Sequence, residues 1–325
     1  MTRLAQYTTL GLGGAATVLE APSQADVVAL VHEYPGARIL GGGSNVVAGD
    51  AGVVEPVIRL TAAGHVRHDD QIIVSAGTAW DDFVAQMVAE GRSGIEALSG
   101  IPGCVGATPI QNMGAYGQEV AETIAGMRVL VRRTGEITTW PAARAQFGYR
   151  SSFFKEHPGE YVVMAVAFDL PEGLSAPVKY AELAGLLQVE IGQRVPVDAV
   201  RQAVLELRRG KGMVLDPTDP DTRSAGSFFT NPIVDHAPEG APGWPQPDGR
   251  VKTSAAWLIE HAGIHKGFAL PGSGAAVSSK HTLALTNRGG TTEDLLELAR
   301  HIRSRVVDVF DIVLLPEPVM WGCAL

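Results

Sequence analysis

Hydrophobic residues recur at helical spacing in several stretches of the chain. The clearest begins at Trp80 and repeats its apolar residues at i, i+3, i+4, i+7 and i+8, the pattern of an amphipathic helix with one buried face. We expect this stripe to pack in the core and not to line a cofactor site. Further helices are predicted between Ser23 and Pro35, over 197–209, over 254–261 and over 292–310. The apolar residues of the stripe are Trp80, Phe83, Val84, Met87 and Val88.

Other segments alternate apolar and polar residues, as strands with one buried face do. In the stretch 127–132, Met127, Val129 and Val131 alternate with Arg128, Leu130 and Arg132, and Thr134-Gly135 predicts a hairpin turn into the next strand. The mixture of helices and strands predicts an α+β chain with mixed sheets. Strands are predicted over 38–40, 71–76, 127–132, 137–140, 161–170, 281–287 and 311–315, with 311–315 as the last strand of the chain.

Length and composition describe a folded chain with room for more than one domain. It has 325 residues, enough for two or three domains of about 100–150 residues each, and it is 46% hydrophobic. It contains no apolar run long enough to span a bilayer, no secretory signal pattern at the N-terminus, and two cysteines, Cys104 and Cys323. We therefore expect no membrane segment, no disulfide framework and a cytoplasmic location. The run 171–177 is a candidate boundary, and 236–250 is predicted to be a surface loop.

The charge distribution argues against a nucleic-acid partner and for a small anionic ligand. The net charge is −9, whereas a general nucleic-acid surface is basic. Cations nevertheless crowd into two short segments, Arg150 with Lys155 and Arg208 with Arg209 and Lys211. A local basic site on an acidic protein favours a small anion. For any one of these residues taken alone, ordinary helix-end charge is the better explanation.

Two glycine-rich loops are the candidate phosphate sites. The segment 98–117 contains five glycines, two prolines, Gln111 and Asn112, and the segment 41–45 reads GGGSN directly after a predicted strand. Glycine lets backbone approach a ligand closely, and the N–H groups of such a turn can cradle an anion. A buried tight turn is an equally good reading of either loop. Segment 41–45 is not GxGxxG and no helix pattern follows it, so a Rossmann site is poorly supported.

Taken together, the motifs resemble those of the UDP-N-acetylenolpyruvoylglucosamine reductase family. The order and rough spacing agree from end to end, so the resemblance covers essentially the whole chain. Segments 41–45 (GGGSN) and 101–117 (IPGCVGATPIQNMGAYG) resemble its two flavin loops. Segments 147–155 (FGYRSSFFK), 225–232 (AGSFFTNP) and 315–319 (LPEPV) resemble those that carry its active-site arginine, serine and glutamate.

The resemblance implies a fold and an activity. Residues 1–68 and 69–176 would form a two-part FAD-binding domain of the vanillyl-alcohol-oxidase (PCMH) type. Residues 177–325 would form an α+β substrate-binding domain whose final strand returns to the active site. FAD would be bound non-covalently, NADPH would supply hydride, and UDP-N-acetylglucosamine enolpyruvate would become UDP-N-acetylmuramate, an intermediate of peptidoglycan. The protein is expected to act as a monomer.

Three residues receive catalytic roles by resemblance, and their chemistry fits those roles. The guanidinium of Arg150 can grip the substrate carboxylate where negative charge builds up. Glu317 can hydrogen-bond the same carboxylate if burial raises its pKa. Ser227 can donate the proton that the reduced carbon takes up. The ordinary alternatives are a surface ion pair, a strand-end charge and a turn or capping serine.

Binding residues are assigned by resemblance in the same way. Gln111 or Asn112 can equally be an amide that holds a turn. One departure from the family pattern is Val319, which stands where an arginine is usual. For the substrate, the candidates are Tyr180, Arg208, Lys211 and Asn231. For FAD, they are Gly41, Gly42, Gly43, Ser44, Asn45, Pro102, Gly103, Cys104, Val105, Gly106, Thr108, Gln111, Asn112 and Gly114.

Two other functions stay open. One is a related flavin oxidase with another substrate, although many such oxidases tether FAD through His or Cys and segment 41–45 contains neither. The other is a non-catalytic sensor of flavin or nucleotide sugar. A sensor has no need of a proton donor, so the co-occurrence of Arg150, Ser227 and Glu317 argues against it.

Overall fold

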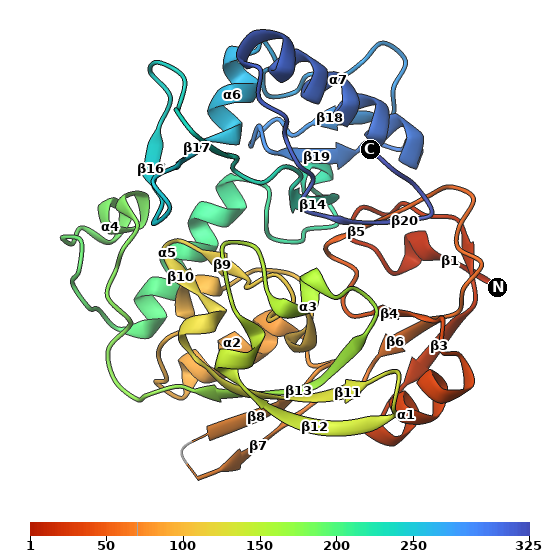
Figure 1. Cartoon of the computed structure of the whole chain (residues 1–325). Coiled ribbons are helices and arrows are strands. Elements are labelled where there is room, and N and C mark those ends of the chain that lie inside the picture. Colours follow the sequence, from red (N-terminus) through yellow and green to blue (C-terminus); the bar gives the residue numbers. More distant parts are fainter. Residues whose placement is uncertain (70) are drawn as a thin grey trace. The chain divides into compact units, whose positions relative to one another are not determined.

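The computed structural model describes residues 1–69 and 71–325 (Figure 1). The chain divides into two compact units, each described by itself below. Unit 1 comprises Met1–Ala16, Gly43–Val53 and Gly210–Leu325, and unit 2 comprises Thr17–Gly42 and Val54–Arg209. The predicted three-part division after residues 68 and 176 stays a prediction. In the described ranges, no helix has the length and apolar character needed to cross a membrane.

Unit 2 contains a five-stranded antiparallel sheet with the order β12-β11-β13-β8-β7. Four of its strands confirm predictions, and the hairpin turn between β11 and β12 has Gly135 at a φ of 72°. The strand β7 was not predicted. The bounds are β7 (His65–His68), β8 (Gln71–Ser75), β11 (Ile124–Val131), β12 (Glu136–Pro141) and β13 (Tyr161–Asp169).

The strands β11 and β13 are buried on both faces, whereas the sequence predicted one buried and one polar face. Met127 and Val129 pack in one core cluster, whereas Leu130, on the face predicted to be polar, is fully buried in another. That second cluster also contains Val27 of the helix α1 (Gln24–Glu33) and Ile58 of a small parallel sheet. The prediction for Leu130 was wrong because a second layer covers this part of the sheet.

A small parallel sheet in unit 2 leads directly into the first glycine loop. Its order is β3-β6-β4, with β3 (Val18–Ala21), β4 (Arg38–Leu40) and β6 (Val57–Leu60). The predicted start of α1 is confirmed, because the side chain of Ser23 accepts a hydrogen bond from the amide of Asp26. Gly41 and Gly42 follow β4 directly.

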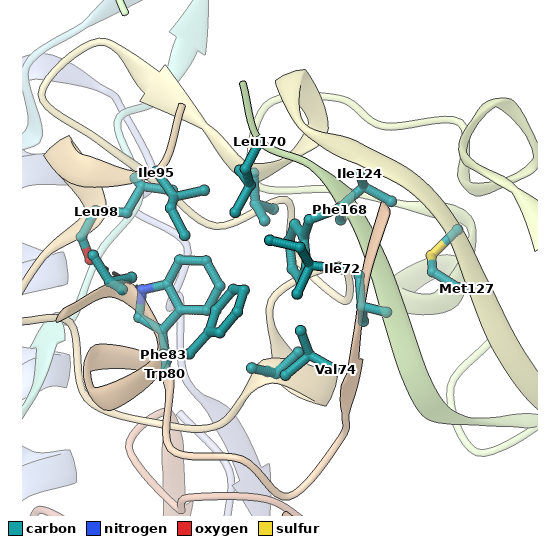
Figure 2. Packing of buried hydrophobic residues seen from close by; sticks show 14 of the residues in the cluster. Ile72, Val74, Trp80, Phe83, Ile95, Leu98, Ile124, Met127, Phe168 and Leu170 are labelled. Carbon is teal, nitrogen blue, oxygen red and sulfur yellow. Dashed lines mark hydrogen bonds between the residues drawn. The ribbon is translucent and has the colours of Figure 1, made fainter. Parts of the chain in front are cut away.

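The helix α2 (Trp80–Ala89) confirms the predicted amphipathic stripe, since all five apolar residues are buried. Figure 2 shows Trp80 and Phe83 among Ile72, Val74 and Phe168. The indole Nε1 of Trp80 donates a 3.0 Å hydrogen bond to the carbonyl of Leu98. The core therefore fixes the start of the second glycine loop. The other helices and strands of unit 2 are α3 (Phe153–Glu156), α4 (Ala181–Leu187), α5 (Val197–Gly210), β9 (Gly114–Ala115) and β10 (Gln118–Glu119).

Truncation of Phe83 tests how much this core contributes to the stability of the fold. Phe83 is 1% exposed, and Phe83→Ala is expected to lower the free energy of unfolding by about 3–5 kcal/mol through lost burial and a residual cavity. Denaturant titration of the variant measures the change. Val66→Ala is the control, because Val66 is 62% exposed and its change should stay within about 0.5 kcal/mol.

Unit 1 is built on the antiparallel sheet β14-β19-β18, against which helices pack. The longest helix, α7 (Thr292–Phe310), has the predicted bounds and begins in a capping box formed by Thr291 and Asp294. The helix α6 (Ala255–His261) starts after Ser254, whose side chain accepts a hydrogen bond from the amide of Trp257. The strands are β14 (Ser224–Ser227), β18 (Ala275–Val277) and β19 (Ala284–Asn287), and β1 (Thr2–Arg3) pairs with β2 (Ala15–Ala16).

The last strand was predicted in the wrong place. Residues 311–315 are irregular, and the last strand is β20 (Val319–Trp321), which pairs in parallel with β5 (Val46–Ala48). Asp311 ends α7 in the left-handed conformation, and Val313 and Leu315 are exposed. The apolar pattern gave a wrong prediction here because, of Val313, Leu314 and Leu315, only Leu314 is buried.

The proline-rich run 236–250 is largely exposed, as expected of a surface loop, but it is not wholly irregular. It contains β16 (Gly243–Pro245), which pairs with β17 (Val251–Thr253), and β17 also pairs with β15 (Ile233–Val234). The prediction missed this small sheet because prolines and glycines hide strand alternation.

Candidate active site

The two glycine loops meet within unit 2. A Cβ atom on Gly41 would lie 2.3 Å from the Sγ of Cys104, and one on Gly42 would lie 2.6 Å from the Cα of Gly103. Both distances are far below van der Waals contact. Glycine is therefore required at these positions by close packing of one loop on the other.

The remainder of the first loop belongs to unit 1, where it is joined to the end of the chain. Gly43 has a φ of 63°, and a Cβ atom there would lie 1.8 Å from the carbonyl oxygen of Tyr7. Asn45 accepts a 2.9 Å hydrogen bond at its carbonyl from the amide of Val319. Its Nδ2 atom also contacts the carbonyl oxygen of Glu317 at 3.4 Å. The loop and the predicted catalytic glutamate therefore share one backbone framework.

The second loop is anchored to unit 2 through a short 3-10 helix, Val105–Ala107. The amide of Gly106 donates to Ala76 at 2.8 Å, and the hydroxyl of Thr108 donates to Val105 at 2.9 Å. Burial raises the pKa of the Cys104 thiol. A protonated, buried thiol is a poor nucleophile, which fits a cofactor that is not tethered to Cys104.

The two loops have no charged side chains of their own. Neither 41–45 nor 98–117 contains an acidic or a basic residue. Their backbone N–H groups can donate, and the polar side chains include Ser44 in the part of the first loop that belongs to unit 1 and Gln111 in unit 2. Arg59, on β6, acts electrostatically on Cys104 and lowers the pKa of its thiol, opposing burial. Arg59 is itself paired with Glu20 at 3.0 Å, so backbone N–H groups are the main feature of these loops that suits the diphosphate of FAD.

Asn112 holds the second loop in shape. It is buried at a φ of 45°, and its Nδ2 donates to Glu119 at 2.7 Å and to the carbonyl of Gly148 at 3.1 Å. Its Oδ1 accepts from the amide of Ala121 at 3.2 Å. Of the two roles left open by the sequence, these contacts describe the amide that fixes a turn.

Arg150 is attached to the same loop. Its Nη2 donates a 2.8 Å hydrogen bond to the carbonyl of Gly114, and its own carbonyl accepts from the ammonium of Lys155 at 2.8 Å. Its φ of 51° is uncommon for a residue with a side chain. Strained backbone of this kind clusters at functional sites, so the conformation supports a functional arginine.

Ser227 and Glu317 lie on neighbouring backbone segments of unit 1. The amide of Glu317 donates to the carbonyl of Phe228 at 2.8 Å, and Phe229 bridges to Pro316. Phe228 and Phe229 are buried, whereas Ser227 and Glu317 are only partly buried. The core thus holds the backbone while both polar side chains keep some exposure. Arg150 belongs to unit 2, so the grouping of all three stays a prediction.

The candidate substrate residues fall in both units. In unit 2, the rings of Tyr180 and Tyr116 meet edge to face at 5.4 Å. Arg208 is buried, and burial lowers its pKa, while Tyr116 and Asp81 act in the opposite direction. Tyr116 was not among the predicted site residues, although its position inside the second glycine loop was a signal that could have led to its contact with Tyr180.

The substrate candidates of unit 1 are Asn231 and Lys211. The Oδ1 of Asn231 accepts from the amide of Ala255 at 3.0 Å, at the start of α6. Lys211 is partly buried. Val319, at the usual arginine position, is half-exposed. A role for Asn231 in shaping the start of α6 is therefore clear, and its contact with substrate stays a prediction.

Asp81 fastens the second loop through an ion pair. Its carboxylate accepts from the Gly100 amide at 2.6 Å and from two nitrogens of Arg201 at 2.6 and 3.0 Å. Burial alone would raise the pKa of the Asp81 carboxyl, but the hydrogen bonds from Arg201 and Gly100 outweigh it and lower the pKa.

The depressed pKa of Asp81 predicts a pH-dependent contribution to stability. The folded protein binds the proton less readily than the unfolded chain, so the contribution is present above the unfolded pKa of about 3.9. It is lost as the pH falls from there through the folded pKa. Asp81→Asn should therefore lower the urea midpoint at pH 7 and converge with the unsubstituted protein in acid. A difference independent of pH would contradict the ion-pair explanation.

Comparison with known proteins gives consistent matches. The family model described as UDP-N-acetylenolpyruvoylglucosamine reductase, C-terminal domain, matches residues 216–321, and an FAD binding domain matches residues 15–140. Relatives named UDP-N-acetylenolpyruvoylglucosamine reductase include those of Streptomyces avermitilis and Thermobifida fusca. The Streptomyces avermitilis protein is 50% identical, and the match covers 99% of this chain and 94% of that protein. The Thermobifida fusca protein is 51% identical, and the match covers 99% of this chain and 97% of that protein.

A solved structure agrees with these relatives. The crystal structure of UDP-N-acetylenolpyruvylglucosamine reductase from Thermus caldophilus is similar to this chain with a TM-score of 0.71 and 28% identity. The match covers 99% of this chain and 98% of that one. The similarity therefore extends over both units.

Proposed function

Because the chain belongs to the UDP-N-acetylenolpyruvoylglucosamine reductase family, we propose that it reduces UDP-N-acetylglucosamine enolpyruvate to UDP-N-acetylmuramate with NADPH as reductant. The family assignment confirms the predicted family, its α+β fold with an FAD-binding domain, and an FAD-dependent oxidoreductase of peptidoglycan synthesis. The observation that carries the proposal is identity of about half over 99% of the chain. The cytoplasmic location and the monomeric state stay predictions.

The two glycine loops are proposed to hold FAD. Gly41 and Gly42 present backbone at the contact with Gly103 and Cys104, where a side chain has no room. Ser44, Thr108 and Gln111 lie in the same loops. When bound, FAD supplies the hydride chemistry that links NADPH to the enolpyruvyl group.

The chain's own residues supply charge stabilisation and a proton. Reduction of an enolpyruvyl ether adds hydride to the terminal carbon, and negative charge develops toward the carboxylate. Arg150 would bind that carboxylate through its planar guanidinium, and Glu317, in its protonated form, would donate a hydrogen bond to it. Ser227 would donate the proton to the neighbouring carbon and take one back from solvent.

The nucleotide-sugar part of the substrate would contact a second group of residues. Tyr180 is 42% exposed beside Tyr116, and a tyrosine there can cover a diphosphate and donate to it. Arg208 and Lys211 would supply positive charge to the anionic groups, and Asn231 would contact the sugar. These roles explain how an acidic protein binds an anionic substrate.

The test follows the flavin spectrum under anaerobic conditions. NADPH should bleach the yellow protein, and UDP-N-acetylglucosamine enolpyruvate should restore its absorbance. UDP-N-acetylglucosamine is the matched control, because it lacks the enolpyruvyl group. If the reduced flavin is not reoxidised by the enolpyruvyl compound, the proposed reaction is wrong even though FAD binds.

Arg150→Ala should separate substrate reduction from cofactor binding. The variant loses the guanidinium expected on the carboxylate, and reoxidation of the reduced flavin should slow by about 10²-fold or more. FAD content should stay close to normal. Arg144→Ala is the control, because Arg144 lies over the ring of Trp140 at 3.8 Å and has no assigned role. Isolation of Arg150→Ala without flavin would contradict the assignment.

A further inference from the structure

A buried carboxylate in unit 2 has no part in the proposed chemistry. Glu96, in the 3-10 helix Glu96–Leu98, is 0% exposed. Its oxygens accept hydrogen bonds from the Gly94 amide, from Nε2 of Gln118 at 3.0 Å and from the Ala176 amide at 2.7 Å. All three donors are uncharged, so the site is built from directed hydrogen bonds. Desolvating a carboxylate is costly, and an apolar side chain would fill this space at a lower cost.

Gln118 completes the arrangement from the opposite end of the second glycine loop. It is 4% exposed, and its Oε1 accepts a 2.8 Å hydrogen bond from the amide of Ala97. Ala97 immediately precedes the loop 98–117 and Gln118 immediately follows it. The Glu96–Gln118 pair therefore joins the two ends of the loop at its base.

This closed loop carries several groups of the proposed site. Gly103 and Cys104 pack against Gly41 and Gly42. Gly114 accepts the hydrogen bond from Arg150, and the ring of Tyr116 contacts that of Tyr180. The third partner of Glu96, Ala176, lies four residues before Tyr180. One buried side chain thus connects both ends of the loop with the segment that leads to a candidate substrate residue.

We propose that Glu96 and Gln118 are positioning residues that hold the second glycine loop in its FAD-binding conformation. Neither side chain needs to touch the cofactor. The pair fixes the loop ends, and the loop presents its backbone to FAD and its Gly114 carbonyl to Arg150. This inference rests on the proposed function in assigning the loop to FAD.

The test compares FAD retention with stability in the full-length holoenzyme. Glu96→Gln keeps the shape but places an NH₂ group against an N–H donor, and Gln118→Leu removes both the donor to Glu96 and the acceptor for the Ala97 amide. Each variant should bind FAD with a dissociation constant about 5–150-fold higher. This ratio corresponds to about 1–3 kcal/mol, the cost of leaving a buried donor unsatisfied when the loop takes up its FAD-binding conformation. Fluorescence of free FAD after dilution measures it. Hydrogen exchange in 98–117 should accelerate in the flavin-free form.

Ser175→Ala is the matched control. Ser175 is 0% exposed, and its hydroxyl accepts from the Val195 amide at 3.1 Å and donates to the Ala176 carbonyl at 2.8 Å; neither of these hydrogen bonds involves Glu96 or Gln118. We expect this variant to lose stability but to keep FAD affinity within about twofold. The double variant Glu96→Gln with Gln118→Glu re-forms the amide–carboxylate hydrogen bond in reverse. It should bind FAD more tightly than the separately measured effects of Glu96→Gln and Gln118→Glu predict when added.

Two outcomes would overturn the positioning role. One is Glu96→Gln and Gln118→Leu losing stability like Ser175→Ala while FAD affinity and loop exchange stay unchanged. The other is an additive double variant. Because these readouts need no substrate, failure of the proposed reaction would show separately, as reduced flavin that the enolpyruvyl nucleotide sugar does not reoxidise.

Discussion

Ser227→Ala should stop the second half-reaction and spare the first. We expect reoxidation of the reduced flavin by UDP-N-acetylglucosamine enolpyruvate to slow by about 10²–10⁴-fold, the usual contribution of a positioned proton donor. Reduction of the flavin by NADPH should proceed at nearly the unsubstituted rate. The asymmetry follows from the chemistry, because a proton goes to carbon only when the substrate is reduced.

The surroundings of Ser227 support this role. It ends the strand β14, where it pairs with Ala284 of β19, and the next two residues are buried phenylalanines. The Glu317 amide donates to the carbonyl of Phe228. The strand pairing and the two buried phenylalanines hold the backbone at Ser227. Removing one oxygen should therefore leave the fold and the flavin environment intact.

Stopped-flow absorbance of the two half-reactions measures the prediction. Ser224→Ala is the control on the same strand, since the Ser224 hydroxyl accepts from the Gly226 amide at 3.3 Å and has no proposed catalytic role. It should change neither half-reaction by more than a few-fold. Equal slowing of both half-reactions in Ser227→Ala would instead indicate a structural role for that serine.

Gly42→Ala should yield protein that is poor in FAD. The added Cβ would lie 2.6 Å from the Cα of Gly103 and 2.9 Å from its carbonyl carbon. The backbone of Gly103 cannot move out of the way as easily as the end of a flexible side chain does, so the added Cβ atom strains the contact between the loops. Overpacking of this kind costs about 1–3 kcal/mol. If that strain is relieved by moving the loops apart, FAD should bind about 5–150-fold more weakly.

Flavin content after gel filtration and the dissociation constant of FAD measure this effect. Gly36→Ala is the control, because a Cβ atom there meets no heavy atom within 4 Å and Gly36 lies in the same unit. It should retain FAD and the same melting temperature within a few degrees. Full flavin content in Gly42→Ala would show that the contact between the loops is not needed to hold the cofactor.

Local pattern predicted the elements that satisfy their own hydrogen bonds. The bounds of α7 and the buried stripe of α2 follow from helical periodicity and caps, which depend on residues a few positions apart. The motif order also identified the family and its FAD domain, since each motif is contiguous in the chain. These features required no knowledge of distant neighbours.

Elements that depend on distant partners were less predictable. The segment 311–315 has the apolar composition of a strand, but pairing with β5 begins at Val319. The sequence places Leu130 on the polar face of β11, but the residue is buried because a second layer of the unit covers that face. The pattern of apolar and polar residues indicates the period of a strand or helix, but it does not indicate which other part of the protein covers each face.

The sequence by itself determined the glycine loops, the candidate catalytic residues and the family that carries them. Only the tertiary structure decided that Gly41 and Gly42 pack on Gly103 and Cys104, and that Glu96 and Gln118 join the two ends of the second loop. The reason is physical. A glycine or a glutamate has the same letter whether it lies in solvent or against backbone, and only the fold supplies the atoms that leave no room for a Cβ or that donate to a buried carboxylate.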